Sequence, residues 1–115
     1  MTTEVNFAVT ESEADGTPVL AVQGEVDVST APELRERLLA LAEAGRTVAV
    51  VDLSEVSFVD STALGVLVSG VKRLRSSGGD LRLVVTQPRI SKVFEITGLD
   101  DVFRIFASAE EAVQA

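Results

Sequence analysis

The stretch TVAVVDLSEVSFVDSTALGVL, residues 47–67, contains the change from strand to helix that determines the predicted fold. Its first part, Thr47 to Leu53, is an almost continuous run of β-branched residues. Such a run is typical of a strand covered on both faces. Val56 to Val59 is predicted to be a short connector. From Asp60 to Ser76, apolar residues recur at helical spacing. A buried strand followed by a helix indicates an α/β protein.

Further strands and helices are predicted on both sides of this stretch. Upstream, we expect a strand at Val5 to Thr10, a second strand at Val19 to Val26, and a helix that starts with a Thr30–Glu33 capping box and stops at Gly45. Downstream, we expect a strand at Asp80 to Thr86, a helix from Pro88 to Gly98, a strand at Val102 to Phe106 and a helix opened by a Ser108–Glu111 capping box. The order β-β-α-β-α-β-α-β-α predicts one α/β domain over residues 1–115, with a mixed central sheet and helices mainly on one face.

The composition excludes several classes of function. The chain has no His and no Cys, which removes the usual general base, the usual zinc ligands and thiolate chemistry. Its formal net charge is −8, so nucleic acid and anionic membranes are unfavourable partners. The uncharged segment from Ser61 to Val71 is far shorter than the ~20 residues that span a bilayer, and the N-terminus does not resemble a signal peptide. We expect a cytoplasmic protein without catalytic residues, cofactor or metal.

Two near-matches to catalytic motifs lie within the predicted helix. Gly65 to Lys72 resembles a phosphate-binding loop over six positions, but its Lys comes one residue late and no Ser or Thr follows. Ser69 to Lys72 matches the Ser-x-x-Lys of penicillin-recognising enzymes, whose other motifs are missing. Neither segment therefore predicts an active site.

Asp52 is a candidate for phosphoryl chemistry, because it lies at the predicted carboxyl end of a central strand, where open α/β sheets bind ligands. A response-regulator receiver accepts a phosphoryl group there, but it also needs an acidic pair after its first strand and a Lys after a late strand. Neither Lys72 nor Lys92 is in that place. The alternative is that Asp52, Glu55 and Asp60 cap turns at the rim of the sheet.

The junction of Asp60 and Ser61 is the second candidate site. Asp60 is a plausible N-cap, and an exposed hydroxyl follows it directly. A phosphoryl group on Ser61 would lie at the positive end of the helix dipole and would add about −1.5 to −2 charges. Two interpretations stay open: simple capping and packing, or a switch that blocks a partner without unfolding the domain.

The flank of the predicted helix beside Ser61 carries unusually small side chains. Gly65, Ser69 and Lys72 follow Ser61 on this flank, so the strip ends in a cation. Gly65 and Gly70 each weaken a helix interior by roughly 1 kcal/mol relative to Ala. We interpret them as positions where a neighbouring element or a partner protein approaches closely.

Two segments resemble the motifs of a known family. Val51 to Gly65, VDLSEVSFVDSTALG, resembles the signature of bacterial anti-sigma factor antagonists, members of the STAS domain superfamily. Gly24 to Ala31, GEVDVSTA, is similar to the second hallmark of that family, which follows its second strand. The length and the order of elements also match, so the resemblance covers essentially the whole chain and implies a single STAS-like domain.

The resemblance implies a partner-switching function rather than an enzyme. The unphosphorylated form would bind an anti-sigma factor that is also a serine kinase and would thereby release a sigma factor. Phosphorylation at Ser61, with Thr62 as a possible minor site, would switch binding off, and a metal-dependent serine phosphatase would reset it. The resemblance also implies that Asp27, on the neighbouring loop, is an acid that contacts the kinase. Taken together with the strip of small side chains, the predicted partner-binding residues are Asp27, Ser29, Thr30, Asp60, Ser61, Thr62, Gly65, Ser69 and Lys72.

Other roles in the superfamily leave an alternative open. Some STAS domains are structural subunits that dock constitutively on a transporter or a signalling scaffold. Such a subunit has less need of a phosphorylatable serine, and the placement of Ser61 argues mildly against it. A receiver-type protein phosphorylated on Asp52 is a third, more distant hypothesis.

Overall fold

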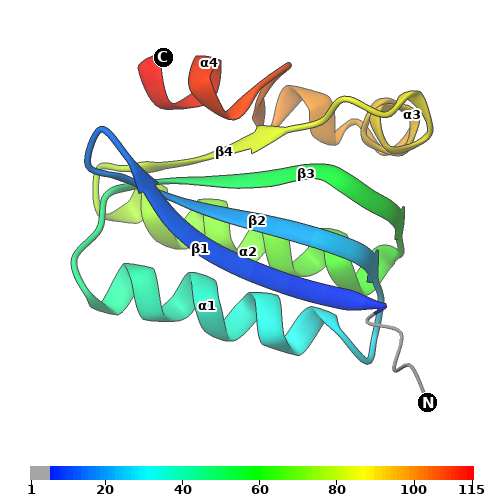
Figure 1. The fold of residues 1–115 in the computed structure, drawn as a ribbon, viewed down its shortest axis with the longest axis horizontal. Coiled ribbons are helices and arrows are strands. Elements are labelled where there is room, and N and C mark those ends of the chain that lie inside the picture. The colour runs from blue at the N-terminus through cyan, green and yellow to red at the C-terminus, as the bar shows by residue number, and fades with distance from the viewer. Residues whose placement is uncertain (1–5) are drawn as a thin grey trace.

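The protein was analysed as a computed structural model, which describes residues 6–115. Strands and helices alternate after an opening hairpin, in the predicted order (Figure 1). The elements are β1 (Phe7–Ala14), β2 (Thr17–Val26), α1 (Ala31–Glu43), β3 (Val48–Val59), α2 (Ser61–Ser76), β4 (Asp80–Val84), α3 (Pro88–Thr97), a 3₁₀ turn (Leu99–Asp101), β5 (Arg104–Phe106) and α4 (Ala109–Gln114).

The five strands form one mixed sheet in the order β1-β2-β3-β4-β5. β1 pairs with β2 in antiparallel orientation, and the other neighbours are parallel. The mixed sheet predicted from the alternation of strands and helices is therefore confirmed. The predicted start of the first strand at Val5 lies outside the described residues.

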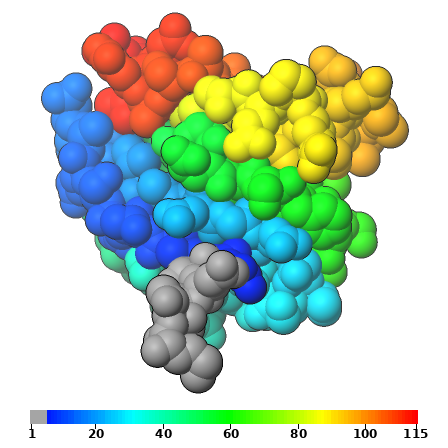
Figure 2. Space-filling model, turned by 45° about the vertical axis from the view of Figure 1, so that its right-hand side comes forward, coloured from blue at the N-terminus to red at the C-terminus, as the bar shows by residue number. Residues whose placement is uncertain are grey.

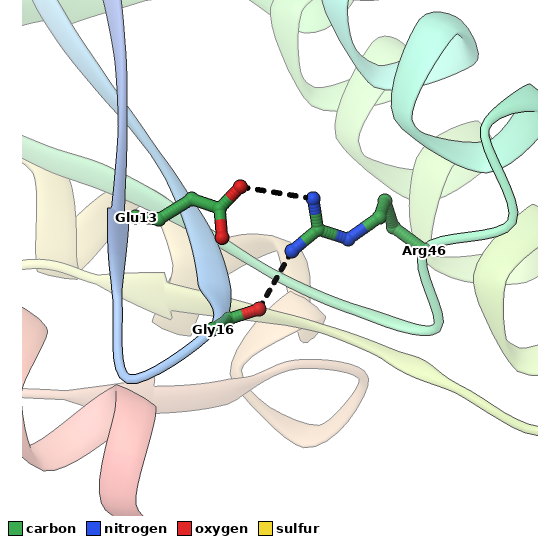
Figure 3. A network of polar contacts seen from close by, with 3 residues as sticks. All are labelled: Glu13, Gly16 and Arg46. Atoms are coloured by element: carbon green, nitrogen blue, oxygen red, sulfur yellow. Dashed lines mark hydrogen bonds and ion pairs between the residues drawn. The ribbon is translucent and has the colours of Figure 1, made fainter.

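The tip of the β1–β2 hairpin is held by an arginine from a distant loop. Asp15 and Gly16 both have positive φ, 51° and 79°, as the commonest two-residue hairpin turn requires. Arg46, which follows α1, donates from Nη1 to Glu13 Oε2 at 3.1 Å and from Nη2 to the Gly16 carbonyl at 2.6 Å (Figure 3). We call this region, Glu13 to Gly16 with Arg46, the hairpin end of the sheet.

The helices cover both faces of the sheet unequally. α1 and α2, the two longest helices, lie side by side on one face, and the short α4 lies on the other (Figure 1). The main core between sheet and helices includes Leu34, Leu38, Leu41, Ala49, Val51, Leu53, Leu64, Leu67, Val71, Leu74, Ile90 and Phe94. A smaller cluster under α4 consists of Val19, Val50, Val84 and Ala112. β3 is thus buried on both faces, as its β-branched run predicted.

β3 runs to Val59, so the prediction that Val56 to Val59 form a connector is wrong. The buried residues Leu53, Val56 and Val59 recur at every third position rather than at every second. The pairing of β3 with β2 shifts register twice, and at each shift β3 has one residue more than β2. These are β-bulges, and each returns the next apolar side chain to the core face. The strand therefore continues although its alternation is interrupted.

The later elements match their predictions apart from their ends. α3 begins at Pro88, and Gly98, with φ 74°, ends it. β4 stops at Val84 rather than Thr86. β5 begins at Arg104 because the N–H groups of Val102 and Phe103 donate back to the Leu99 carbonyl of the 3₁₀ turn. Within residues 6–115, no helix combines the length and apolar character needed to cross a membrane.

Candidate functional site

Two segments of the predicted site meet where β2 and β3 end. The two strands are parallel and pair Val26 with Val59, so the residues that follow each strand emerge at the same edge of the sheet. The Asp60 N–H donates to the Val26 carbonyl at 3.2 Å, which fixes Asp60 beside the residue that precedes Asp27. Figure 2 shows this side of the molecule, where the light-blue to cyan chain after β2 adjoins the green end of β3. Residues 33 positions apart in sequence therefore form one site.

Asp60 is the N-cap of α2, as predicted. Its backbone is extended, and Oδ1 accepts a hydrogen bond from the Ala63 N–H at 2.9 Å. The next two residues, Ser61 and Thr62, are both exposed. Their N–H groups belong to the first turn, where no intrahelical acceptor exists. Two hydroxyls therefore lie at the positive end of a 16-residue helix.

The segment Asp27 to Thr30, here called the Asp27 loop, is folded around one carboxylate oxygen. Asp27 Oδ1 accepts from the Ser29 N–H at 2.9 Å and the Ser29 hydroxyl at 2.7 Å, and from Thr30 N–H at 3.2 Å. These hydrogen bonds, first of all that from the Ser29 hydroxyl, lower the pKa of Asp27 below its usual value. Asp27 is therefore ionised at neutral pH and presents a fixed negative charge at the edge of the sheet where α2 begins.

The predicted capping box at Thr30 is wrong. The Thr30 hydroxyl accepts from the Asp27 N–H at 2.9 Å and lies 2.8 Å from the Glu25 carbonyl, to which it donates. The side chain therefore points back to the end of β2 and makes no cap hydrogen bond to α1. The Asp27 carboxylate and carbonyl bind the N–H groups at this turn instead. At α4, Ser108 does cap the Glu111 N–H, but Glu111 accepts from Ala107 rather than from Ser108.

The remaining predicted residues extend the site along α2. Ser61, Gly65, Ser69 and Lys72 are all exposed, and we call them the α2 strip. A Cβ built on Gly65 would meet no other atom within 4 Å. The two glycines of the helix therefore differ, because a Cβ on Gly70 would come within 3.0 Å of Leu38 Cδ1 in α1. Close approach inside the molecule accounts for Gly70 but not for Gly65.

Asp52 lies in the middle of β3, seven residues before its end, and not at the strand terminus where a receiver carries its phosphorylated acid. Its Oδ1 accepts from the Ser54 N–H at 3.0 Å and the Ser54 hydroxyl at 2.7 Å. The Asp52 carboxylate therefore binds its own strand at the first bulge of β3, so the expectation that it caps a turn at the rim of the sheet is also wrong for this residue. In the part of the chain that the structure describes, no group of three or more His, Cys, Asp or Glu side chains could hold a metal ion.

Two apolar side chains near the site were missed by the sequence analysis. Val28, in the Asp27 loop, is 71% exposed, and Phe58, two residues before Asp60, is 46% exposed. Large exposed apolar residues beside polar ones are typical of protein-binding surfaces. Phe58 could have been found only by recognising that β3 continues past Leu53, because its bulges place this side chain outward.

An α/β domain with exposed hydroxyls at the carboxyl edge of its sheet is the class of protein that the fold and the site define. The model of the STAS domain family matches residues 8–112. The chain therefore belongs to the STAS domain family, as its two motifs predicted.

Two of the known proteins similar to the chain are named anti-sigma factor antagonists. The chain is 42% identical over 110 residues to an anti-sigma-B factor antagonist of Bacillus subtilis (strain 168). The match covers 96% of this chain and 98% of that protein. The fold of the chain is similar to a crystal structure of an anti-sigma factor antagonist from Mycobacterium paratuberculosis, with 29% identity, a TM-score of 0.86 and coverage of 94% and 92% of the two chains. The Bacillus cell fate determinant SpoIIAA in its phosphorylated form has 25% identity, a TM-score of 0.73 and coverage of 93% and 97%.

Proposed function

We propose that the protein is an anti-sigma factor antagonist whose binding is switched off by phosphorylation of Ser61. The observation that carries this proposal is the exposed Ser61 hydroxyl at the first position of α2, directly after the N-cap residue Asp60. Two relatives named as anti-sigma factor antagonists, and a similar structure of a Bacillus cell fate determinant in a phosphorylated form, support it. On this proposal the unphosphorylated chain binds an anti-sigma factor with serine kinase activity and so frees a sigma factor.

The phosphoryl transfer needs only an accessible hydroxyl from this chain. The Ser61 oxygen attacks the γ-phosphorus of ATP, a new P–O bond forms, ADP leaves, and the serine proton passes to a base of the kinase. A metal-dependent phosphatase reverses the modification by hydrolysis and releases inorganic phosphate. On this proposal the general base and the phosphatase chemistry are supplied by the partners.

The same geometry explains how phosphorylation blocks binding without unfolding the domain. The phosphate would lie at the start of α2, where the helix dipole and free N–H groups favour negative charge. It would also add about −1.5 to −2 charges next to Asp60 and the ionised Asp27. A partner that docks on this edge would then face a concentrated negative charge, and like charges brought together at an interface cost several kcal/mol.

The Asp27 loop is proposed to contact the kinase. All the hydrogen bonds that Ser29 and Thr30 donate to the carboxylate end on Oδ1, so the carboxylate is held in one orientation. The exposed Val28 next to it provides apolar contact area. We place Asp27, Ser29, Thr30, Thr62 and the α2 strip together in the binding surface.

The test is incubation with the cognate kinase and ATP, followed by mapping of the modified residue. We expect one acid-stable phosphate on Ser61, no modification of Ser61→Ala, and normal modification of Thr62→Ala. Acid-labile phosphate on Asp52 would point to a receiver-type protein instead. Stable binding to a transporter or scaffold protein that is unaffected by Ser61→Glu would support the constitutive structural subunit.

A further inference from the structure

A groove separates α1 and α2 on the face turned away from the sheet. It encloses about 190 Å³. Its apolar lining consists of Leu38 and Leu39 from α1 and Val66 and Gly70 from α2, and Arg35 and Arg73 lie one on each helix. The groove owes its form to Gly70, because a side chain there would press on Leu38.

The charge at this groove is opposite to that of the whole molecule. The chain has a net charge of −8, yet α2 holds three of its ten basic residues and none of its 18 acidic ones. No acidic residue lines the groove. Among residues 6–115, the ion pairs involve Arg37, Arg46 and Arg75, so Arg35 and Arg73 are left without an acidic partner in that part of the chain. An anionic ligand would therefore be attracted here and repelled by most of the remaining surface.

The groove continues the candidate site along α2. Its α2 residues, Val66, Ser69, Gly70 and Arg73, recur at the spacing of one helix face, and Ser69 also belongs to the α2 strip. Val66 is five residues after Ser61, a rise of about 7.5 Å along the helix. That rise is about one Debye length at physiological salt, so a phosphate on Ser61 acts, partly screened, on the near end of the groove and hardly on Arg73, which is a rise of about 18 Å away.

We infer that the groove receives an acidic segment of the anti-sigma factor, anchored by an apolar side chain between α1 and α2. Arg35 and Arg73 pair with its carboxylates, and a phosphate on Ser61 opposes the carboxylates at the near end of the groove. This inference rests on the proposed function, since it names the part of the partner that the switch acts upon.

Charge reversal of the two arginines tests the inference. The probe is the purified anti-sigma factor, whose kinase activity modifies Ser61. The variant is the double substitution Arg35→Glu and Arg73→Glu. We expect the dissociation constant to rise at least about tenfold, mainly through a slower association rate, with a weaker dependence on salt. The matched control, Lys92→Glu with Arg104→Glu, changes the net charge equally on α3 and β5 and should bind within about twofold of wild type.

The outcomes separate this inference from the proposed function. If the double reversal binds like wild type while Ser61→Glu still loses binding, the groove is not the docking place and the switch stands. If Ser61→Glu binds like wild type, the switch itself fails, and the inference that rests on it fails too.

Crosslinking identifies the occupant directly. The chain has no Cys, so Ser69→Cys carries a benzophenone label at one place in the groove, and Ala107→Cys carries it at an exposed position before α4. In the purified complex, the label at position 69 should crosslink to a peptide of the anti-sigma factor that contains several acidic residues, and the label at position 107 should not. A crosslink from position 69 to a peptide without acidic residues, or no crosslink in a complex that has formed, would overturn the inference.

Discussion

At the hairpin end of the sheet, Arg46 donates to both Glu13 and Gly16 and so binds the exposed turn to the loop after α1. At the opposite edge, where β2 and β3 end, the polar residues are arranged differently. The carboxylates of Asp60 and Asp27 accept hydrogen bonds from residues two or three positions further along the chain, whereas Ser61 and Thr62 are exposed. The polar groups at the hairpin end stabilise the fold. Some of the polar groups at the site end are instead held in position to contact a partner. Substitutions at the two ends should therefore affect different measurements.

The largest effect is expected for Ser61→Glu at the site end. The new carboxylate should weaken binding to the anti-sigma factor by about 30-fold or more, because it brings like charges together at the interface. The melting temperature should stay within about 2 °C of wild type, because a negative charge is favourable at a helix N-terminus. Isothermal titration calorimetry and thermal unfolding measure the two quantities. Ser61→Gln has the same size without the charge, so equal loss with Gln and Glu would contradict an electrostatic switch.

Gly65→Leu should also separate binding from stability. A side chain at this position points into open space, so the free energy of unfolding should rise by up to about 1 kcal/mol through better helix propensity. Binding should weaken by about tenfold, because the leucine stands in the way of a closely approaching partner. Gly65→Ala is the control and should stabilise the helix with a smaller effect on binding. Marked destabilisation of either variant would show that Gly65 serves packing within the domain.

Arg46→Ala, at the hairpin end, should lower stability without changing binding. Loss of both hydrogen bonds should lower the free energy of unfolding by about 1 kcal/mol, since the side chain is partly exposed and the pair with Glu13 is screened. That corresponds to a fall of about 4 °C in melting temperature. Binding to the anti-sigma factor should not change. Arg46→Lys should recover only part of the stability, because one ammonium group cannot reproduce the two-pronged contact.

These contrasts also show which features a sequence can reveal. The cap at Asp60 and the exposed Ser61 were predicted correctly, because an N-cap depends on the few residues around it. The cap at Thr30 failed although the local pattern was as good, because the Asp27 carboxylate and the end of β2 compete for the same groups. Local rules give no means of ranking such competitors.

The course of β3 and the groove depend on contacts that are distant in sequence. The two bulges of β3 are defined by its pairing with β2, so a search for strict alternation ends the strand too early. Gly70 was noticed as unusual, but only the structure shows that it faces Leu38 of α1 while Gly65 faces open space. The groove itself joins residues of two helices about 30 positions apart. What could be predicted was the existence and order of elements, and what could not was their mutual register.

The smallest expected effect concerns the pH dependence of the Asp27 loop. Hydrogen bonds from Ser29 and Thr30 lower the pKa of Asp27 in the folded protein below the 3.8 of an unperturbed Asp. The ionised loop therefore contributes stability that is fully present above pH 3.8 and is lost as the pH falls through the lower, native pKa. Asp27→Asn should remove this contribution, so the difference in stability between wild type and variant should be constant near neutral pH and should shrink in acid.

Urea unfolding at several pH values and an NMR titration of the Asp27 carboxyl measure this dependence. Ser29→Ala is the informative control, because it removes the donor with the largest effect on the pKa of Asp27 and should move that pKa back towards 3.8. A wild-type titration at or above 3.8 would contradict the geometry of the loop. Because the Asp27 loop lies at the site end, the loss of its hydrogen bonds in acid should also weaken binding to the anti-sigma factor, whereas Arg46→Ala at the hairpin end should leave binding unchanged.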